Sequence, residues 1–101
     1  MKNFLSYEEF INESMNEGAV KAFEMAIDTL INHVKKGSGW IDPDYVYDSL
    51  EAIDNSINWN HWDSLKDEVY KRLIDADILY FANDSDPSKK GKKVTNSNQI
   101  D

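Results

Sequence analysis

Apolar residues recur at three- and four-residue spacing in three stretches of this chain, which is the period of one helix face. The first stretch predicts a helix over residues 15–36. Its apolar face comprises Val20, Phe23, Ile27, Leu30 and Val34. The preceding Ser14-Met15-Asn16-Glu17 fits a capping box, and Gly37 is placed to adopt the left-handed conformation that closes a helix.

Two further helices follow. One is predicted to begin at Asp42-Pro43-Asp44 and to end near residues 55–56. Asp42 can cap this helix, and Pro43 is tolerated in its first turn because the N–H that proline lacks has no helical partner there. Its inner face comprises Val46, Leu50 and Ile53. The other runs from about Asn60 to Asp75. Its inner face comprises Trp62, Leu65, Val69, Leu73 and Ala76, and its wet face Lys66, Asp67, Lys71, Arg72 and Asp75.

The period changes after the third helix. Residues 78–81 are a short β-prone apolar run, residues 83–88 are dense in turn formers, and residues 92–95 are predicted to return as a second strand. Residues 96–101 are predicted to form a flexible tail. The predicted fold class is therefore mainly α, or α+β, with three helices and a two-stranded hairpin in one domain over residues 14–95. A plain helical bundle with an irregular C-terminal part is the alternative.

This order of elements resembles a winged-helix domain, most specifically over residues 69–80. There an aliphatic-rich helix stops just before an Ile-Leu strand, as at the entry to the hairpin, or wing, of such domains. In members that read DNA, the resemblance implies a third helix in the major groove and a wing on the phosphates. The sequence carries no signal for the additional small strand that such domains often have. A fold resemblance alone also implies no activity.

The first thirteen residues have the pattern of a separate amphipathic leader. The segment contains three short elements in order, which are Met1-Lys2, Tyr7-Glu8-Glu9-Phe10-Ile11 and Ile11-Asn12-Glu13. Together they resemble the capsid-targeting leaders of internal head proteins in T-even-like tailed bacteriophages. Those leaders end in an (Ile/Leu)-x-Glu site that the prohead protease cuts. The resemblance implies that Ile11 and Glu13 are recognised and that cleavage falls before Ser14. An ordinary N-terminal helix packed on the domain is the alternative.

The leader resemblance implies a non-enzymatic head-associated protein, located in the capsid interior or in the host cytoplasm. Proteins of this kind are scaffold components, or are injected with DNA to protect it from host defences. Its partners would then be the prohead protease, the scaffold or a host protein. The injected proteins are often basic, whereas this chain carries a net charge of −8. This departure from the family's pattern argues against neutralisation of packaged DNA and favours inhibition of a host DNA-binding or defence protein, because an acidic surface can compete for a basic DNA groove. A cytoplasmic winged-helix regulator that binds protein or DNA is the alternative.

Charge is divided unevenly along the chain. Residues 14–88 contain six basic and fifteen acidic residues, whereas residues 89–101 contain four Lys and one Asp. An acidic body repels nucleic acid phosphates and favours basic protein partners. Nucleic acid is thus a disfavoured partner, although the sequence offers six candidate contacts. They are Lys71, Arg72, Lys89, Lys90, Lys92 and Lys93.

The sequence predicts no catalytic, cofactor or metal site. It has no cysteine, and His33 and His61 do not stand at metal-ligand spacing. It also lacks a Gly-rich phosphate loop and a nucleophile motif. No apolar run approaches the roughly 18 residues of a membrane span, so no membrane partner is predicted.

The three tryptophans are the remaining candidates for partner binding, since Trp is enriched at interface hot spots. Trp59 stands between two asparagines and is predicted to be an exposed anchor for a protein partner. Trp40 and Trp62 are expected instead to close the small core.

Overall fold

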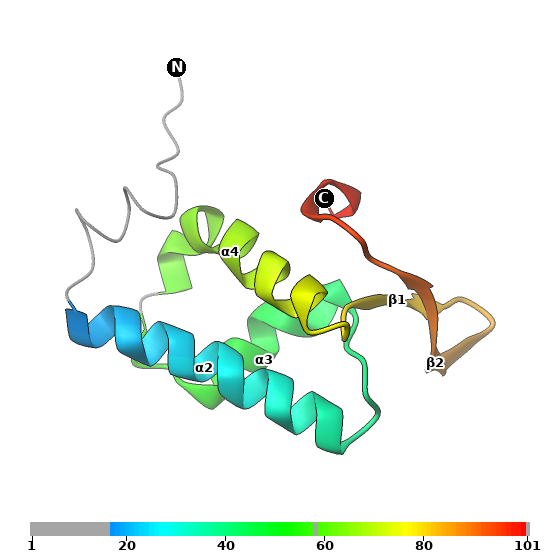
Figure 1. Cartoon of the computed structure of the whole chain (residues 1–101), viewed down its shortest axis with the longest axis horizontal. Coiled ribbons are helices and arrows are strands. Elements are labelled where there is room, and N and C mark those ends of the chain that lie inside the picture. Colours follow the sequence, from blue (N-terminus) through cyan, green and yellow to red (C-terminus); the bar gives the residue numbers. More distant parts are fainter. Residues whose placement is uncertain (1–16, 58, 101) are drawn as a thin grey trace.

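The computed structural model describes residues 17–57 and 59–100. Three helices, α2 (Glu17–Lys36), α3 (Val46–Ile53) and α4 (Trp62–Asp75), precede an antiparallel hairpin of β1 (Tyr80–Asn83) and β2 (Asp86–Lys93). Figure 1 shows the helices gathered together and the hairpin extending from one end of them. The predicted mainly helical fold with a C-terminal hairpin is confirmed. The predicted leader, residues 1–13, lies outside the described residues.

The core forms where the apolar faces of the helices meet. Its largest fully buried side chains include Phe23, Ile27, Leu30, Leu50, Leu65 and Leu73. The helical periodicity predicted most of these faces correctly, but Val20 is half-buried outside the core cluster and Ile53 is 36 % exposed. The helix α3 ends at that residue, earlier than predicted, so its inner face stops at Leu50. Ile57 from the following loop is buried in the core.

The end of α2 differs from the prediction. Among the described glycines, Gly39 and not Gly37 has a left-handed conformation, with φ of +87°. The amide of Gly39 donates to the carbonyl oxygen of Val34 at 2.8 Å, while Gly37 donates to that of His33 at 3.1 Å. The helical hydrogen bonding therefore continues through Gly37, and the chain reverses two residues later.

A Schellman motif closes α4 and directs the chain into the hairpin. Asp77 has φ of +62°, a conformation that Asp adopts more readily than most residues. Its amide donates to the carbonyl of Ile74 at 3.0 Å, and the amide of Ile78 donates to that of Leu73 at 3.3 Å. The reversal buries Ile78 together with the following Leu79. Half of the predicted strand 78–81 is therefore core, and β1 begins at Tyr80.

The second strand is longer than predicted. Because β2 begins at Asp86, the expected turn over residues 83–88 shrinks to residues 84–85. Pro87 is tolerated there because each strand of a two-stranded sheet has an open edge. Between the Ala82–Lys90 and Asn83–Asp86 pairs β2 has three extra residues, and between the Tyr80–Lys93 and Ala82–Lys90 pairs it has one. Gly91 lies in this bulge, where an added Cβ would be 3.0 Å from the carbonyl oxygen of Phe81.

Two further segments attach to the hairpin and core. Ile41, between α2 and α3, forms a parallel bridge with Leu79, and its amide donates to the carbonyl of Ile78 at 2.8 Å. Residues 96–100, within the predicted flexible tail, include a short helical turn at Ser97–Gln99. The Asn96 side chain caps it, and Gln99 Oε1 accepts from the Asn96 amide at 3.0 Å. Ile100 packs against the core.

Candidate protein-binding surfaces

The exposed side of α4 is an acidic ridge. Asp63, Asp67, Lys71 and Asp75 follow one another at four-residue spacing, which places them on one helix face, and all four are exposed. Lys71 is the ammonium group within this row, and the neighbouring Lys66 Nζ lies 4.0 Å from a carboxylate oxygen of Asp63. Asp67 and Asp75 therefore give the ridge its excess of negative charge. A groove of about 410 Å³ adjoins the ridge, between α4 and residues 95–97. This surface repels phosphates and attracts cationic partners.

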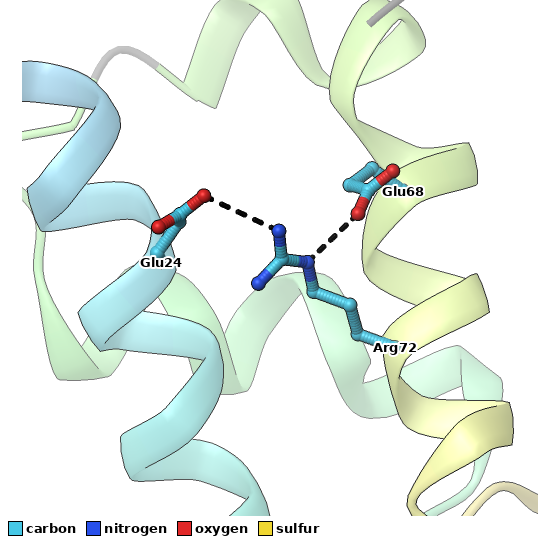
Figure 2. Close-up of polar contacts among 3 residues, drawn as sticks. All are labelled: Glu24, Glu68 and Arg72. Atoms are coloured by element: carbon cyan, nitrogen blue, oxygen red, sulfur yellow. Dashed lines mark hydrogen bonds and ion pairs between the residues drawn. The ribbon is translucent and has the colours of Figure 1, made fainter. Parts of the chain in front are cut away.

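Arg72, a predicted partner contact, lies on another side of α4 and is 31 % exposed. Figure 2 shows its guanidinium between α2 and α4. Its Nε lies 2.8 Å from a carboxylate oxygen of Glu68, and its Nη2 lies 3.3 Å from one of Glu24. Glu68 lies beside Arg72 on α4 because the two residues are four positions apart, whereas Glu24 belongs to α2. The charge of Arg72 is thereby paired within the domain.

The four predicted contact lysines of the C-terminal part all lie on β2 and are exposed. Three of them interact with neighbours. Lys89 Nζ lies 3.7 Å from Asp86, Lys90 Nζ lies 4.7 Å from the centroid of the Tyr80 ring, and Lys93 forms an ion pair with Asp77. The hydrogen bond and charge of Lys93 lower the pKa of Asp77, and the same contact raises the pKa of Lys93. The lysines of β2, which also include Lys92, are therefore partly neutralised by their own domain.

The prediction that Trp59 is an exposed anchor is wrong, because its side chain is 4 % exposed. Its indole Nε1 donates to the carbonyl oxygen of Asp54 at 2.9 Å. Its ring centroid lies 6.2 Å from that of Phe23 and 6.3 Å from that of Trp62. The neighbouring asparagines suggested a polar setting, but the short helical turn at Trp59–His61 directs the ring inward.

Trp62, as expected, contributes to the core, where it is half-buried in an aromatic cluster. Its ring lies 5.3 Å from that of Tyr47 and 5.9 Å from that of Tyr70, both edge to face. Burial raises the pKa of the Tyr70 hydroxyl, and Asp44 and Asp67 add to this shift through their charge. The cluster joins α3 to α4, so its aromatic residues stabilise the scaffold beneath the acidic ridge.

A second concave surface was missed by the sequence reasoning. A groove of about 520 Å³ lies between the hairpin and the segment that leads from α2 into α3. We call it the hairpin groove. It is lined by Ser38, Trp40, Ile41, Asp42, Asp44, Tyr45, Phe81, Ala82, Asp84, Pro87 and Ser88. Asp42 was identifiable from sequence as a helix cap, but nothing local indicated that residues 81–88 lie opposite it.

No three His, Asp or Glu side chains within residues 17–57 and 59–100 are arranged to hold a metal ion. His33 and His61 are both exposed. No helix in the described part of the chain has the length and apolar character that a membrane crossing requires. The proposed processing residues Ile11, Glu13 and Ser14 fall outside the described residues.

Comparisons of the chain with protein-family models, with curated proteins and with solved structures found no match.

Proposed function

We propose that this chain is an internal head protein of a tailed bacteriophage, and that its folded domain is a non-enzymatic module that binds a basic surface on another protein. In this proposal the leader directs the chain to the prohead and is removed. The mature domain then acts on a host DNA-binding or defence protein. The location and the binding role are supported by different observations.

The location rests on the leader motifs and on where the folded part begins. Cleavage after Glu13 would leave α2, which starts at Glu17, intact. The buried apolar residues of the described part run from Phe23 to Val94, so all of them would remain in the mature chain. A removable leader requires a domain that keeps its core after the cut, and this arrangement is compatible with that requirement.

The fold proposed for the domain is of the winged-helix type. Three helices precede the hairpin in the expected order. The bridge between Ile41, which precedes α3, and Leu79, which precedes β1, is a short additional strand contact that was not predicted from the sequence. In such a domain α4 occupies the position of the DNA-reading helix.

The acidic ridge is the observation that carries the binding role. Where a DNA-reading helix presents cations, α4 exposes Asp63, Asp67 and Asp75 beside Lys71, and its Lys66 is paired with Asp63 at 4.0 Å. Carboxylates spaced along one helix face are complementary to the basic groove with which a protein holds DNA. The ridge can therefore compete with DNA for such a groove.

The lysines on β2 favour a second candidate function, DNA binding by a winged-helix regulator. The observation that supports DNA binding is the exposure of these lysine side chains. Against it, Lys89, Lys90 and Lys93 are each engaged by a neighbouring side chain, and Arg72 is bonded to two glutamates. Lys66 of α4 lies 4.0 Å from Asp63, and Lys71 is then the cation that α4 presents to a phosphate, beside Asp67 and Asp75. We therefore place protein binding first.

Mass spectrometry of purified phage particles tests the proposed location. Peptides from residues 17–100 should be present in particles treated with protease and nuclease from outside. Their absence from such particles, with the chain present in infected cells, would leave the cytoplasmic module as the better hypothesis. Binding of a random-sequence DNA duplex by the purified protein at physiological salt would contradict the binding role.

A further inference from the structure

The hairpin groove is a built feature of the domain, because one buried carboxylate fixes both of its walls. Asp42 is 8 % exposed and accepts from the amide of Asp44 at 2.9 Å and from the amide of Ala82 at 2.7 Å. The first bond holds the turn that enters α3, and the second holds β1. The two walls, 40 residues apart in sequence, are thereby locked at a set separation.

The lining of this groove combines aromatic rings with carboxylates. Trp40 and Phe81 are half-buried, and Tyr45 is 63 % exposed despite its size. Asp44 and Asp84 are exposed at the same groove. Neither carboxylate forms an ion pair with a cation in the part of the chain that the structure describes. Aromatic rings and carboxylates are thus accessible together at one concave surface.

Rings and carboxylates together select a cation. A guanidinium or ammonium group over an aromatic face is attracted by the ring, and a carboxylate adds charge and hydrogen bonds. Guanidinium suits this lining better than ammonium, since it is planar, stacks on rings and pairs with carboxylates through two parallel bonds. A groove of about 520 Å³ is also large enough for a whole arginine side chain with part of the backbone that carries it.

We propose that the hairpin groove binds an arginine side chain presented by a basic segment of the protein partner. The inference rests on the proposed protein-binding function and adds a second, separate contact, because the groove shares no residue with the acidic ridge. The ridge supplies general attraction to a basic surface. The groove supplies selection for arginine at one position.

The test measures peptide binding to the purified full-length chain by NMR titration and calorimetry. The probe is a capped hexa-arginine peptide, and hexa-lysine carries the same charge. Amide shifts should concentrate at Trp40, Tyr45 and Ala82, and hexa-arginine should bind at least several-fold more tightly than hexa-lysine. Equal affinity for the two peptides, or shifts confined to α4, would overturn the inference.

A matched pair of double variants separates the groove from net charge. Asp44→Asn with Asp84→Asn should weaken hexa-arginine binding roughly tenfold, since each lost carboxylate contact contributes a few-fold. Asp63→Asn with Asp67→Asn removes the same charge from the ridge and should change that affinity by less than about threefold. Equal losses in both variants would overturn the inference. Tyr45→Ala, in which an exposed ring is removed, is an independent groove variant and should also lower the preference for hexa-arginine.

The peptide experiments and the particle experiments test different hypotheses. If the groove does not select arginine, the proposed particle location and leader processing still stand. If the protein is absent from particles, the measured peptide affinities are unaffected.

Discussion

The carboxylate of Asp42 accepts a hydrogen bond of 2.7 Å from the amide of Ala82, and this bond joins the start of α3 to the hairpin. Asp42 is the buried charged residue of the described core, and its other oxygen caps the turn before α3. One short side chain thus performs a local role that is readable in sequence and a long-range role that is not. The hairpin groove exists because of the second role.

Replacing Asp42 by Ala should therefore lower the free energy of unfolding by about 1–3 kcal/mol, since two amides lose their acceptor. Asp42→Asn should cost less, because Asn still caps with its carbonyl oxygen. Urea unfolding followed by circular dichroism measures both. Glu51→Ala, at an exposed position of α3, is the control and should change stability by less than about 0.5 kcal/mol. An Asp42→Ala variant as stable as this control would contradict the anchoring role.

Arg72 should couple more strongly to Glu68 than to Glu24. Glu68 is 19 % exposed and bonds at 2.8 Å, whereas Glu24 is 44 % exposed and bonds at 3.3 Å. Double-mutant cycles built from Arg72→Met, Glu68→Gln and Glu24→Gln should give roughly 0.5–1 kcal/mol for the first pair and less for the second. Both values should shrink in 1 M salt through screening. A larger coupling to Glu24 would show that the geometry in Figure 2 is not the dominant one.

Trp59 should matter for stability and not for binding. Trp59→Ala should cost about 3–5 kcal/mol through the cavity it leaves. Trp59→Phe keeps most of the packing but leaves the carbonyl of Asp54 without its indole donor, so it should cost about 1–2 kcal/mol. Denaturant unfolding measures both, and peptide affinity measured on the folded Trp59→Phe protein should equal that of the unchanged chain. Lost affinity with unchanged stability would restore the exposed-anchor hypothesis.

The ion pair of Asp77 with Lys93 should make stability depend on pH at both extremes. The pKa of Asp77 is lowered below its ordinary 3.8, so its contribution is present above that value and is lost as the pH falls through the lower, folded pKa. The pKa of Lys93 is raised above 10.5, so its contribution is complete below that value and is lost as the pH rises through the higher, folded pKa.

Asp77→Asn should remove this contribution and flatten the acid side of the stability profile. Asn is a suitable replacement because it also tolerates a φ of +62°. Thermal unfolding between pH 2 and pH 5 is the measurement. Asp75→Asn removes an exposed carboxylate nearby and should leave this part of the profile unchanged. If both variants flatten the acid side of the stability profile equally, the loss of net negative charge and not the loss of the ion pair explains the change.

The sequence predicted those features that depend on local periodicity and capping. The faces of α2 and α4 and the cap at Asp42 are examples, because each is encoded within about one turn of helix. Two errors concern the exact end of a helix: α3 ends at Ile53, and the left-handed residue after α2 is Gly39 instead of Gly37. The third arises where a distant segment decides, since residues 86–91 become strand because β1 offers a partner.

The candidate surfaces, too, were predictable where they depend on local spacing and not where they depend on contacts between distant segments. The acidic ridge was visible in the spacing of Asp63, Asp67, Lys71 and Asp75, and the paired state of Arg72 was not, because Glu24 is 48 residues away. Trp59 was misjudged from its polar neighbours, since the direction of a ring depends on the turn that carries it. The hairpin groove has no local signal, because its walls meet only in the folded chain.

Removal of the leader is the part of the proposed function that a single measurement tests most directly. In the resembled family the protease reads the residues corresponding to Ile11 and Glu13, so Glu13→Ala should block the cut, whereas Asn12→Ala, at the variable position, should not. The measurement is the N-terminal residue of the chain extracted from purified phage particles, determined by intact-mass spectrometry. The proposed function predicts Ser14, with 88 of the 101 residues retained. An intact Met1 in the particle-borne chain would contradict it.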